Sequence, residues 1–153
     1  LPFSDGALAA VVDMGARRHA ISPHAAAREV ARALASGAAL VMTEYVERES
    51  DHASFFNALE QLRRPAATAR FGKAADATGP IEAAGLAIDS VAFFRERRAF
   101  RDMEVDAARG EAGPDLAPWR ALLALASQDM RALYDIDADG MSWRRLAFIA
   151  RKT

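Results

Sequence analysis

Short apolar runs alternate with amphipathic segments along the chain, and this alternation predicts its secondary structure. Residues 7–12 form an almost wholly apolar run with two valines, which favours a strand covered on both faces. Ser22 is a good helix N-cap and Pro23 suits the first helical position, and apolar residues then recur at helical spacing to Leu34. The predicted strands are residues 7–12, 38–42, 86–100 and 141–152, and the predicted helices are residues 23–34, 52–62, 80–84, 101–109 and 118–133. This alternating order indicates an α/β fold.

The first strand, the helix after it and the second strand form one crossover unit, so the two strands should be parallel neighbours. The first strand has no partner before it in the chain, and we expect something else to cover its free edge. Further along, Gly79 and Pro80 are predicted to open a short helix that Gly85 ends. Residues 118–133 give the most regular amphipathic helix, with core positions predicted at Trp119, Leu122, Leu123, Leu125 and Met130.

Composition narrows the class of protein without changing this picture. The 153 residues suit one domain with a substantial core, and 52% hydrophobic with 27% charged residues is globular. A net charge of −1 gives no field that would attract nucleic acid or an anionic membrane. The lack of cysteine excludes disulfides, thiolate metal sites and cysteine nucleophiles. No apolar run approaches the roughly 18 residues that span a bilayer, and we expect a cytoplasmic protein.

Four segments in register resemble the C-terminal half of class I S-adenosylmethionine-dependent methyltransferases, particularly those of ubiquinone and menaquinone biosynthesis. LPFSDGALAAVV resembles the region of the family's fourth strand, and ISPHAAAREVARALASGAALVMTEYV is similar to the helix and strand that follow. IEAAGLAIDSVAFFR and LAFIARK are similar to the approach to the sixth strand and to the final strand. The resemblance implies a Rossmann-like methyltransferase sheet in the order first, second, fourth, third strand, flanked by helices. Its last strand would be antiparallel and inserted.

The resemblance covers only that half of the family's fold. The family's glycine-rich loop and the acidic residue that holds the cofactor's ribose have no counterpart in the sequence, which begins with Leu1. We therefore expect residues 1–153 to form a single domain that is completed by an N-terminal half on a second chain or on a segment not represented here. The resemblance implies methyl transfer from S-adenosylmethionine to a small-molecule acceptor in an oligomeric assembly.

Candidate site residues follow the ends of the first two strands, because ligands of open α/β sheets gather at the carboxyl ends of their strands. The resemblance implies that Asp13, Met14 and Gly15 approach the cofactor. It places His19 near the acceptor, where a histidine can accept a proton. Asp13 could equally cap a loop, and the segment with His19 could be a solvated loop.

The same reasoning gives four candidate contacts to the acceptor. Arg17 and Arg18 could hold an anionic acceptor, whereas Glu44 and Tyr45 end the second strand and could line its pocket. Packing or capping is the competing interpretation of the last two. DIDADG, at residues 135–140, opens like a calcium loop, but its twelfth position is a leucine where a bidentate glutamate is required, so we predict a turn and no metal site.

Two other functions remain open at the level of sequence. The chain could be a non-catalytic methyltransferase-like subunit that binds and stabilises a partner. It could also be a free-standing α/β binding domain.

Overall fold

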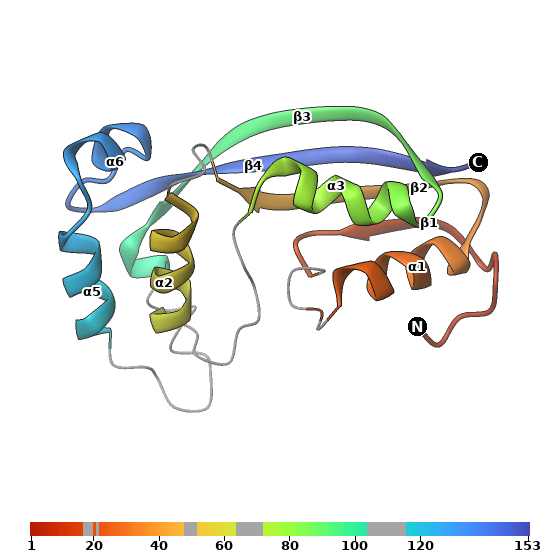
Figure 1. Cartoon of the computed structure of the whole chain (residues 1–153), viewed down its shortest axis with the longest axis horizontal. Coiled ribbons are helices and arrows are strands. Elements are labelled where there is room, and N and C mark those ends of the chain that lie inside the picture. The colour runs from red at the N-terminus through yellow and green to blue at the C-terminus, as the bar shows by residue number, and fades with distance from the viewer. Residues whose placement is uncertain (17–19, 21, 48–51, 64–71, 104–115) are drawn as a thin grey trace.

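In a computed structural model, the chain forms one open sheet with helices along it (Figure 1). The structure describes residues 1–16, 20, 22–47, 52–63, 72–103 and 116–153. The strands are β1 (Leu8–Asp13), β2 (Leu34–Val46), β3 (Leu86–Ala99) and β4 (Gly140–Lys152). The helices are α1 (Pro23–Ala33), α2 (Ala53–Arg63), α3 (Ala74–Ala83), α5 (Ala117–Ala124) and α6 (Gln128–Leu133).

The order of the strands is β1-β2-β4-β3, as the resemblance implied. β1 and β2 are parallel, and β4 lies antiparallel between β2 and β3. The α/β class and the inserted last strand are thus confirmed. The carboxyl ends of β1, β2 and β3 therefore point to the same end of the sheet.

The β1–α1–β2 unit forms for the local reasons that the sequence predicts. The Ser22 hydroxyl accepts a hydrogen bond from the backbone N–H of Ala25 at 3.2 Å, and Pro23 occupies the first turn. β2 is longer than predicted at both ends. It starts at Leu34, which already pairs with Leu8, and its pairing with β4 extends to Val46.

β1 is covered on one face only, which corrects the expectation of a strand covered on both faces. Val11 packs against the core beside α1, so alternation along the strand directs Val12 to the opposite face. There the Val12 side chain is 66% exposed. Among the described residues, no strand pairs with the outer edge of β1.

Two hydrophobic cores lie along the sheet, with α1 and α3 at one end and α2, α5 and α6 at the other (Figure 1). β4 contributes Leu146 and Phe148 to the first core and Met141 and Trp143 to the second. Because even and odd positions of a strand face opposite ways, β4 serves the two cores from its two faces. Arg145, at an odd position, shares the face of Trp143.

The predicted helix at residues 118–133 is two helices, because a new cap interrupts it. The Ser127 hydroxyl accepts the backbone N–H of Met130 at 3.2 Å and starts α6. The Arg131 guanidinium donates to the carbonyl oxygens of Leu123, Ala124 and Ala126, so it satisfies the end of α5. Leu125 falls in the break and is 77% exposed instead of being a core residue. The other four predicted core positions are buried or half-buried.

α3 begins earlier than predicted, and Pro80 lies inside it instead of at its start. The carboxylate of Asp76 accepts the backbone N–H of Lys73 at 2.8 Å, which fixes the helix start there. The end was predicted correctly, with Gly85 at a positive φ of 84°. Residues 100–103 are helical, and the remainder of the predicted helix at 101–109 lies outside the described residues. None of the described helices is both long and apolar enough to cross a membrane.

Candidate functional site

The end of β1 leaves a step at the carboxyl edge of the sheet. β1 stops at Asp13, level with Met42 of β2, while β2 continues to Val46 with β4 and β3 beside it. The residues after β1 therefore lie next to the continuing surface of β2. Open α/β sheets bind ligands at such strand ends.

Asp13 shapes the turn that leaves β1. Its Oδ1 atom accepts the backbone N–H of Ala16 at 2.6 Å, and Gly15 has a φ of 91° in the left-handed region. The capping role considered for Asp13 is therefore present. On the face of α1, Asp13 also lines a cavity of about 200 Å³ whose other walls are apolar side chains of β2, α1, α3 and the segment between β1 and α1.

Met14, the next residue, reaches the opposite face of the sheet. Its side chain is 67% exposed, and its sulfur accepts a hydrogen bond from the Thr43 hydroxyl at 3.8 Å. The Thr43 oxygen in turn accepts from Nη2 of Arg145 at 2.5 Å. The turn after β1 is thus connected to the middle of β4.

Arg145 is the centre of a network that spans three strands. Its Nη1 atom donates to Oε2 of Glu96 at 2.8 Å, and the Tyr45 hydroxyl donates to the same oxygen at 3.2 Å. The guanidinium carbon lies 4.7 Å from the centre of the Tyr45 ring. The Arg145 side chain is only 13% exposed, and that of Glu96 is 30% exposed. Arg145 and Glu96 therefore compensate most of each other's charge, and the hydroxyls of Thr43 and Tyr45 complete their hydrogen bonds. We name Met14, Thr43, Tyr45, Glu96 and Arg145 the edge network.

The surroundings of Tyr45 raise the pKa of its hydroxyl. Burial raises the pKa of Tyr45 above its ordinary value of 10, and the negative charge of Glu96 raises it further. The positive charge of Arg145 acts against these two effects and is the smaller influence. Tyr45 is accordingly a hydrogen-bond donor at neutral pH.

Asp13 and Gly15 form the turn after β1, and the structure places the other predicted site residues in three situations. Met14 and Tyr45 meet in the edge network. Glu44 points to the face opposite Tyr45, where it is buried and its Oε1 accepts the backbone N–H of Tyr45 at 3.1 Å. Arg17, Arg18 and His19 lie outside the described residues.

Sequence reasoning missed Thr43, Glu96 and Arg145. One signal was available for Arg145, because the residues two before and two after it in the predicted closing strand, Trp143 and Ala147, are apolar. A charge on that face suggests a buried group that needs a partner. The choice of Glu96 as that partner required the register between β3 and β4.

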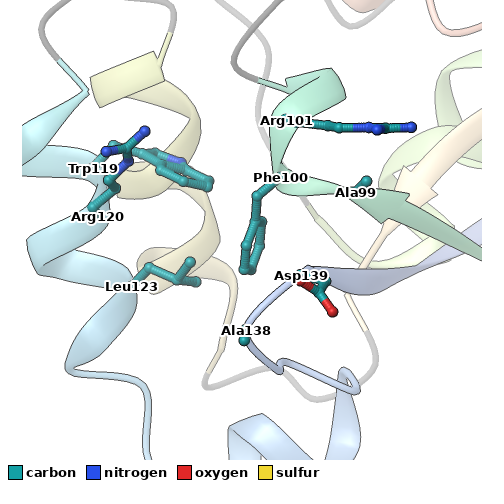
Figure 2. A pocket seen from close by; sticks show the side chains of 8 residues that line it. All are labelled: Ala99, Phe100, Arg101, Trp119, Arg120, Leu123, Ala138 and Asp139. Atoms are coloured by element: carbon teal, nitrogen blue, oxygen red, sulfur yellow. The ribbon is translucent and has the colours of Figure 1, made fainter.

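A larger cavity of about 650 Å³ lies between α5 and the end of β3 (Figure 2). Phe100 points toward Trp119 and Leu123 across it, while Arg101 points away (Figure 2). The register places Val91 level with Asp13, and the cavity begins eight residues further along β3. At roughly 3.3 Å per residue this is about 26 Å along the strand. The cavity is therefore separate from the turn after β1, although Glu96 of the edge network lies only three residues before it on β3.

Metal binding finds no support in the described ranges, where no group of three or more histidine, aspartate or glutamate side chains could hold an ion. Asp137 instead stabilises its own turn, because its Oδ1 accepts the backbone N–H groups of Asp139 and Gly140 at 2.8 and 2.9 Å. Its Oδ2 accepts from Arg97 at 2.6 Å. Residues 135–140 form the predicted turn.

Comparison with known proteins identifies the fold. No protein-family model matches the sequence, and no curated protein matches it. Among solved structures, a proposed methyltransferase from Bacillus halodurans superposes with a TM-score of 0.84 at 19% identity, over 99% of this chain and 73% of that one. The [4+2]-cyclase SpnF gives a TM-score of 0.59 at 23% identity, over 99% of this chain and 53% of that one.

A third similar structure contains bound ligands. Geranyl diphosphate C-methyltransferase from Streptomyces coelicolor, in complex with Mg²⁺, geranyl diphosphate and S-adenosyl-L-homocysteine, gives a TM-score of 0.55 at 16% identity. It is matched over 100% of this chain and 50% of its own. The chain thus has the Rossmann-like fold of class I S-adenosylmethionine-dependent methyltransferases and spans about half to three quarters of these structures. The cyclase shows that this fold also carries another reaction.

Proposed function

We propose that this chain is the acceptor-side part of a methyltransferase that uses S-adenosylmethionine to methylate a small molecule. One observation carries the proposal. The whole chain has the methyltransferase fold, and a partly exposed polar network stands beside the turn after β1, at the carboxyl edge where such a sheet binds ligands. Polar groups held in fixed positions at that edge suit the orientation of a substrate.

The turn after β1 fits one wall of the cofactor site. The carboxylate of Asp13 offers a negative charge to a sulfonium ion, and the capped turn holds it in place. Met14 is exposed, and Gly15, which is buried, gives the turn its left-handed backbone conformation. When bound, S-adenosylmethionine would supply an already activated methyl group.

The remaining cofactor contacts belong to the N-terminal half expected from the sequence, on a second chain or on an unrepresented segment. Under this proposal residues 1–153 form the C-terminal half of the domain. The open edge of β1 and the exposed Val12 are the surface on which that half would pack. A cytoplasmic location and an oligomeric assembly are parts of the same proposal.

On the acceptor side, Tyr45 lines the proposed acceptor-binding surface, and His19 accepts the proton that the acceptor loses. Arg17 and Arg18 complete the proposed acceptor contacts, whereas Glu44 is buried on the opposite face and is not assigned to the acceptor. The reaction asks mainly for alignment of a nucleophile with the activated methyl group, so fixed hydrogen-bonding groups are more important than strongly reactive side chains.

A second function, a non-catalytic subunit that stabilises a partner, is favoured by a different observation. The face of the sheet opposite α1 exposes Val12 and Phe94, and exposed apolar side chains of this size are typical of surfaces that a partner covers. This function needs no cofactor, so cofactor binding separates the two proposals.

The deciding experiment is a calorimetric titration with S-adenosylmethionine, on the chain alone and on any partner complex that co-purifies with it. Methyl transfer requires saturable binding in at least one state, and failure in both would refute it. Asp13→Asn keeps the cap of the turn and removes the charge, so it should weaken binding about fivefold or more. Asp102→Ala, an exposed residue far along the chain, is the control and should change nothing. Equal affinities for wild type and Asp13→Asn would remove the Asp13 charge from the cofactor site.

A further inference from the structure

Glu96 and the turn after β1 border one surface. Three hydrogen bonds, none longer than 3.8 Å, lead from the Met14 sulfur through Thr43 and Arg145 to Glu96. Phe94 lies beside Arg145 on the same face, 44% exposed, and its ring centre is 5.8 Å from the guanidinium carbon. A molecule long enough to extend from Met14 across Arg145 can therefore also contact Glu96.

The two carboxylate oxygens of Glu96 have different surroundings. Oε2 accepts hydrogen bonds from both Arg145 and Tyr45. Within the described part of the chain, no donor is bonded to Oε1. Because Oε2 is held at two points, the carboxylate is fixed and Oε1 is left to accept a hydrogen bond from outside the protein.

The Arg145 guanidinium is less accessible to an anionic ligand than Oε1 of Glu96 is to a hydrogen-bond donor. Its Nη1 and Nη2 atoms each donate one hydrogen bond, to Glu96 and to Thr43, and its Nε atom is buried with no partner among the described residues. The whole side chain is only 13% exposed. A carboxylate or phosphate would reach the remaining Nη hydrogens only over this small exposed area, and the charge of Glu96 beside them would repel it. The network therefore selects a ligand that donates a hydrogen bond.

We propose that the acceptor of the proposed methyl transfer is a small molecule with an apolar, preferably aromatic, frame that carries a hydroxyl or amino group, and that this group donates a hydrogen bond to Oε1 of Glu96. The frame packs on the exposed Phe94 ring and the Met14 side chain. This inference rests on the proposed function and adds the class of its acceptor and Glu96 as a residue that determines specificity.

The test uses three probes with one ring and different polar groups: benzylamine, benzyl alcohol and benzoate. Each is titrated into the full ¹⁵N-labelled chain while the backbone amide NMR signals of Met14, Thr43 and Phe94 are followed. Benzylamine and benzyl alcohol should shift these signals saturably, and benzoate should bind at least about fivefold more weakly. Equal or stronger binding of benzoate would overturn the proposal, and so would the absence of shifts with all three probes.

Glu96→Gln tests the residue itself, because it keeps the shape of the side chain and removes its charge. Benzylamine should bind about tenfold more weakly to this variant, whereas Glu82→Gln, an exposed change on α3, should leave its affinity as in wild type. Unchanged benzylamine affinity in Glu96→Gln, with the chain folded by circular dichroism, would overturn the assignment. Glu96→Gln should not alter the affinity for S-adenosylmethionine. If the cofactor fails to bind while the probes bind as described, methyl transfer is refuted and Glu96 remains a donor-binding site.

Discussion

The ion pair between Arg145 and Glu96 should also be measurable in the stability of the fold. Arg145→Met removes the guanidinium and keeps most of the apolar stem. It deletes the bonds of 2.8 Å to Glu96 and 2.5 Å to Thr43, and the stacking on Tyr45 at 4.7 Å. A hydrogen bond to a charged group contributes about 1.5–3 kcal/mol. Glu96 is 30% exposed, so water replaces part of this when the partner is lost. We expect the free energy of unfolding to fall by about 1–3 kcal/mol.

The interaction itself is isolated by a double-mutant cycle with Glu96→Gln. Glutamine still accepts hydrogen bonds from Arg145 and Tyr45 without the charge, so this single change should cost about 1 kcal/mol. Once Arg145 is methionine, Glu96→Gln removes an unpaired charge and should cost less. We expect a coupling energy of about 1 kcal/mol, with the double variant more stable than the sum of the single effects predicts.

The assay is urea unfolding followed by circular dichroism, with the denaturant dependence unchanged among the variants. Arg144→Met is the control, because Arg144 stacks on Phe93 at 3.9 Å on the other face of β4 and should be additive with Glu96→Gln. A coupling energy below about 0.5 kcal/mol for Arg145 and Glu96 would mean that the two do not interact in solution. The same small coupling is the expected result for Arg144 and Glu96.

Four further changes test separate parts of the structure. Gly79→Ala, inside α3 with open space around the added Cβ, should stabilise the fold by about 0.5–1 kcal/mol in thermal unfolding. Gly85→Ala meets equally open space but has a φ of 84°, so it should cost about 1–2 kcal/mol; the same sign for both changes would contradict the assigned backbone. Ser127→Ala removes the N-cap of α6 and should cost about 1 kcal/mol in urea unfolding, and no loss would argue for one continuous helix. The raised pKa of Tyr45 stabilises the fold below pH 10, and this contribution is lost as the pH rises from 10 through the pKa of the folded state. Glu96→Gln should lower the pKa of Tyr45 in a titration that follows tyrosinate absorbance. Tyr134, the other tyrosine of the chain, gives a second signal in the same titration and serves as an internal reference.

The fold was predictable wherever local patterns and chain order decide it. The Ser22 cap and the apolar runs on either side of α1 defined a crossover unit, and the resemblance supplied the order of the strands. Boundaries failed where two local signals compete. Ser127 is a cap inside an amphipathic pattern, and Asp76 starts α3 upstream of the more conspicuous Gly79 and Pro80. Hydrophobic periodicity alone does not locate the start of these helices, because an N-cap residue can occur within a segment whose apolar residues keep helical spacing.

The candidate site was predictable on one side only. The strand-end rule identified the residues after β1 and at the end of β2, whereas Thr43 and Arg145 are 102 residues apart and meet only through register. The arginine-rich end of β3 is typical of a solvated edge, and for one face this is correct, since Arg95 and Arg97 pair with the acidic turn after α6. The intervening Glu96 points the other way, because side chains alternate along a strand. A charge run on a strand therefore has to be divided by face before it is interpreted.

The surface over the edge network constrains what can cover it. Its rim is apolar, with Val12 and Met14 on one side and Phe94 on the other, but its centre is the partly buried pair of Arg145 and Glu96. An apolar helix from a partner would remove the remaining water from Glu96 and leave Oε1 without a partner, which costs free energy. A covering element or ligand must therefore bring a hydrogen-bond donor to the centre and apolar surface to the rim. This requirement separates the two proposals, because a partner that only packs on the sheet should bind more tightly to Glu96→Gln, whereas a donor-bearing acceptor should bind more weakly.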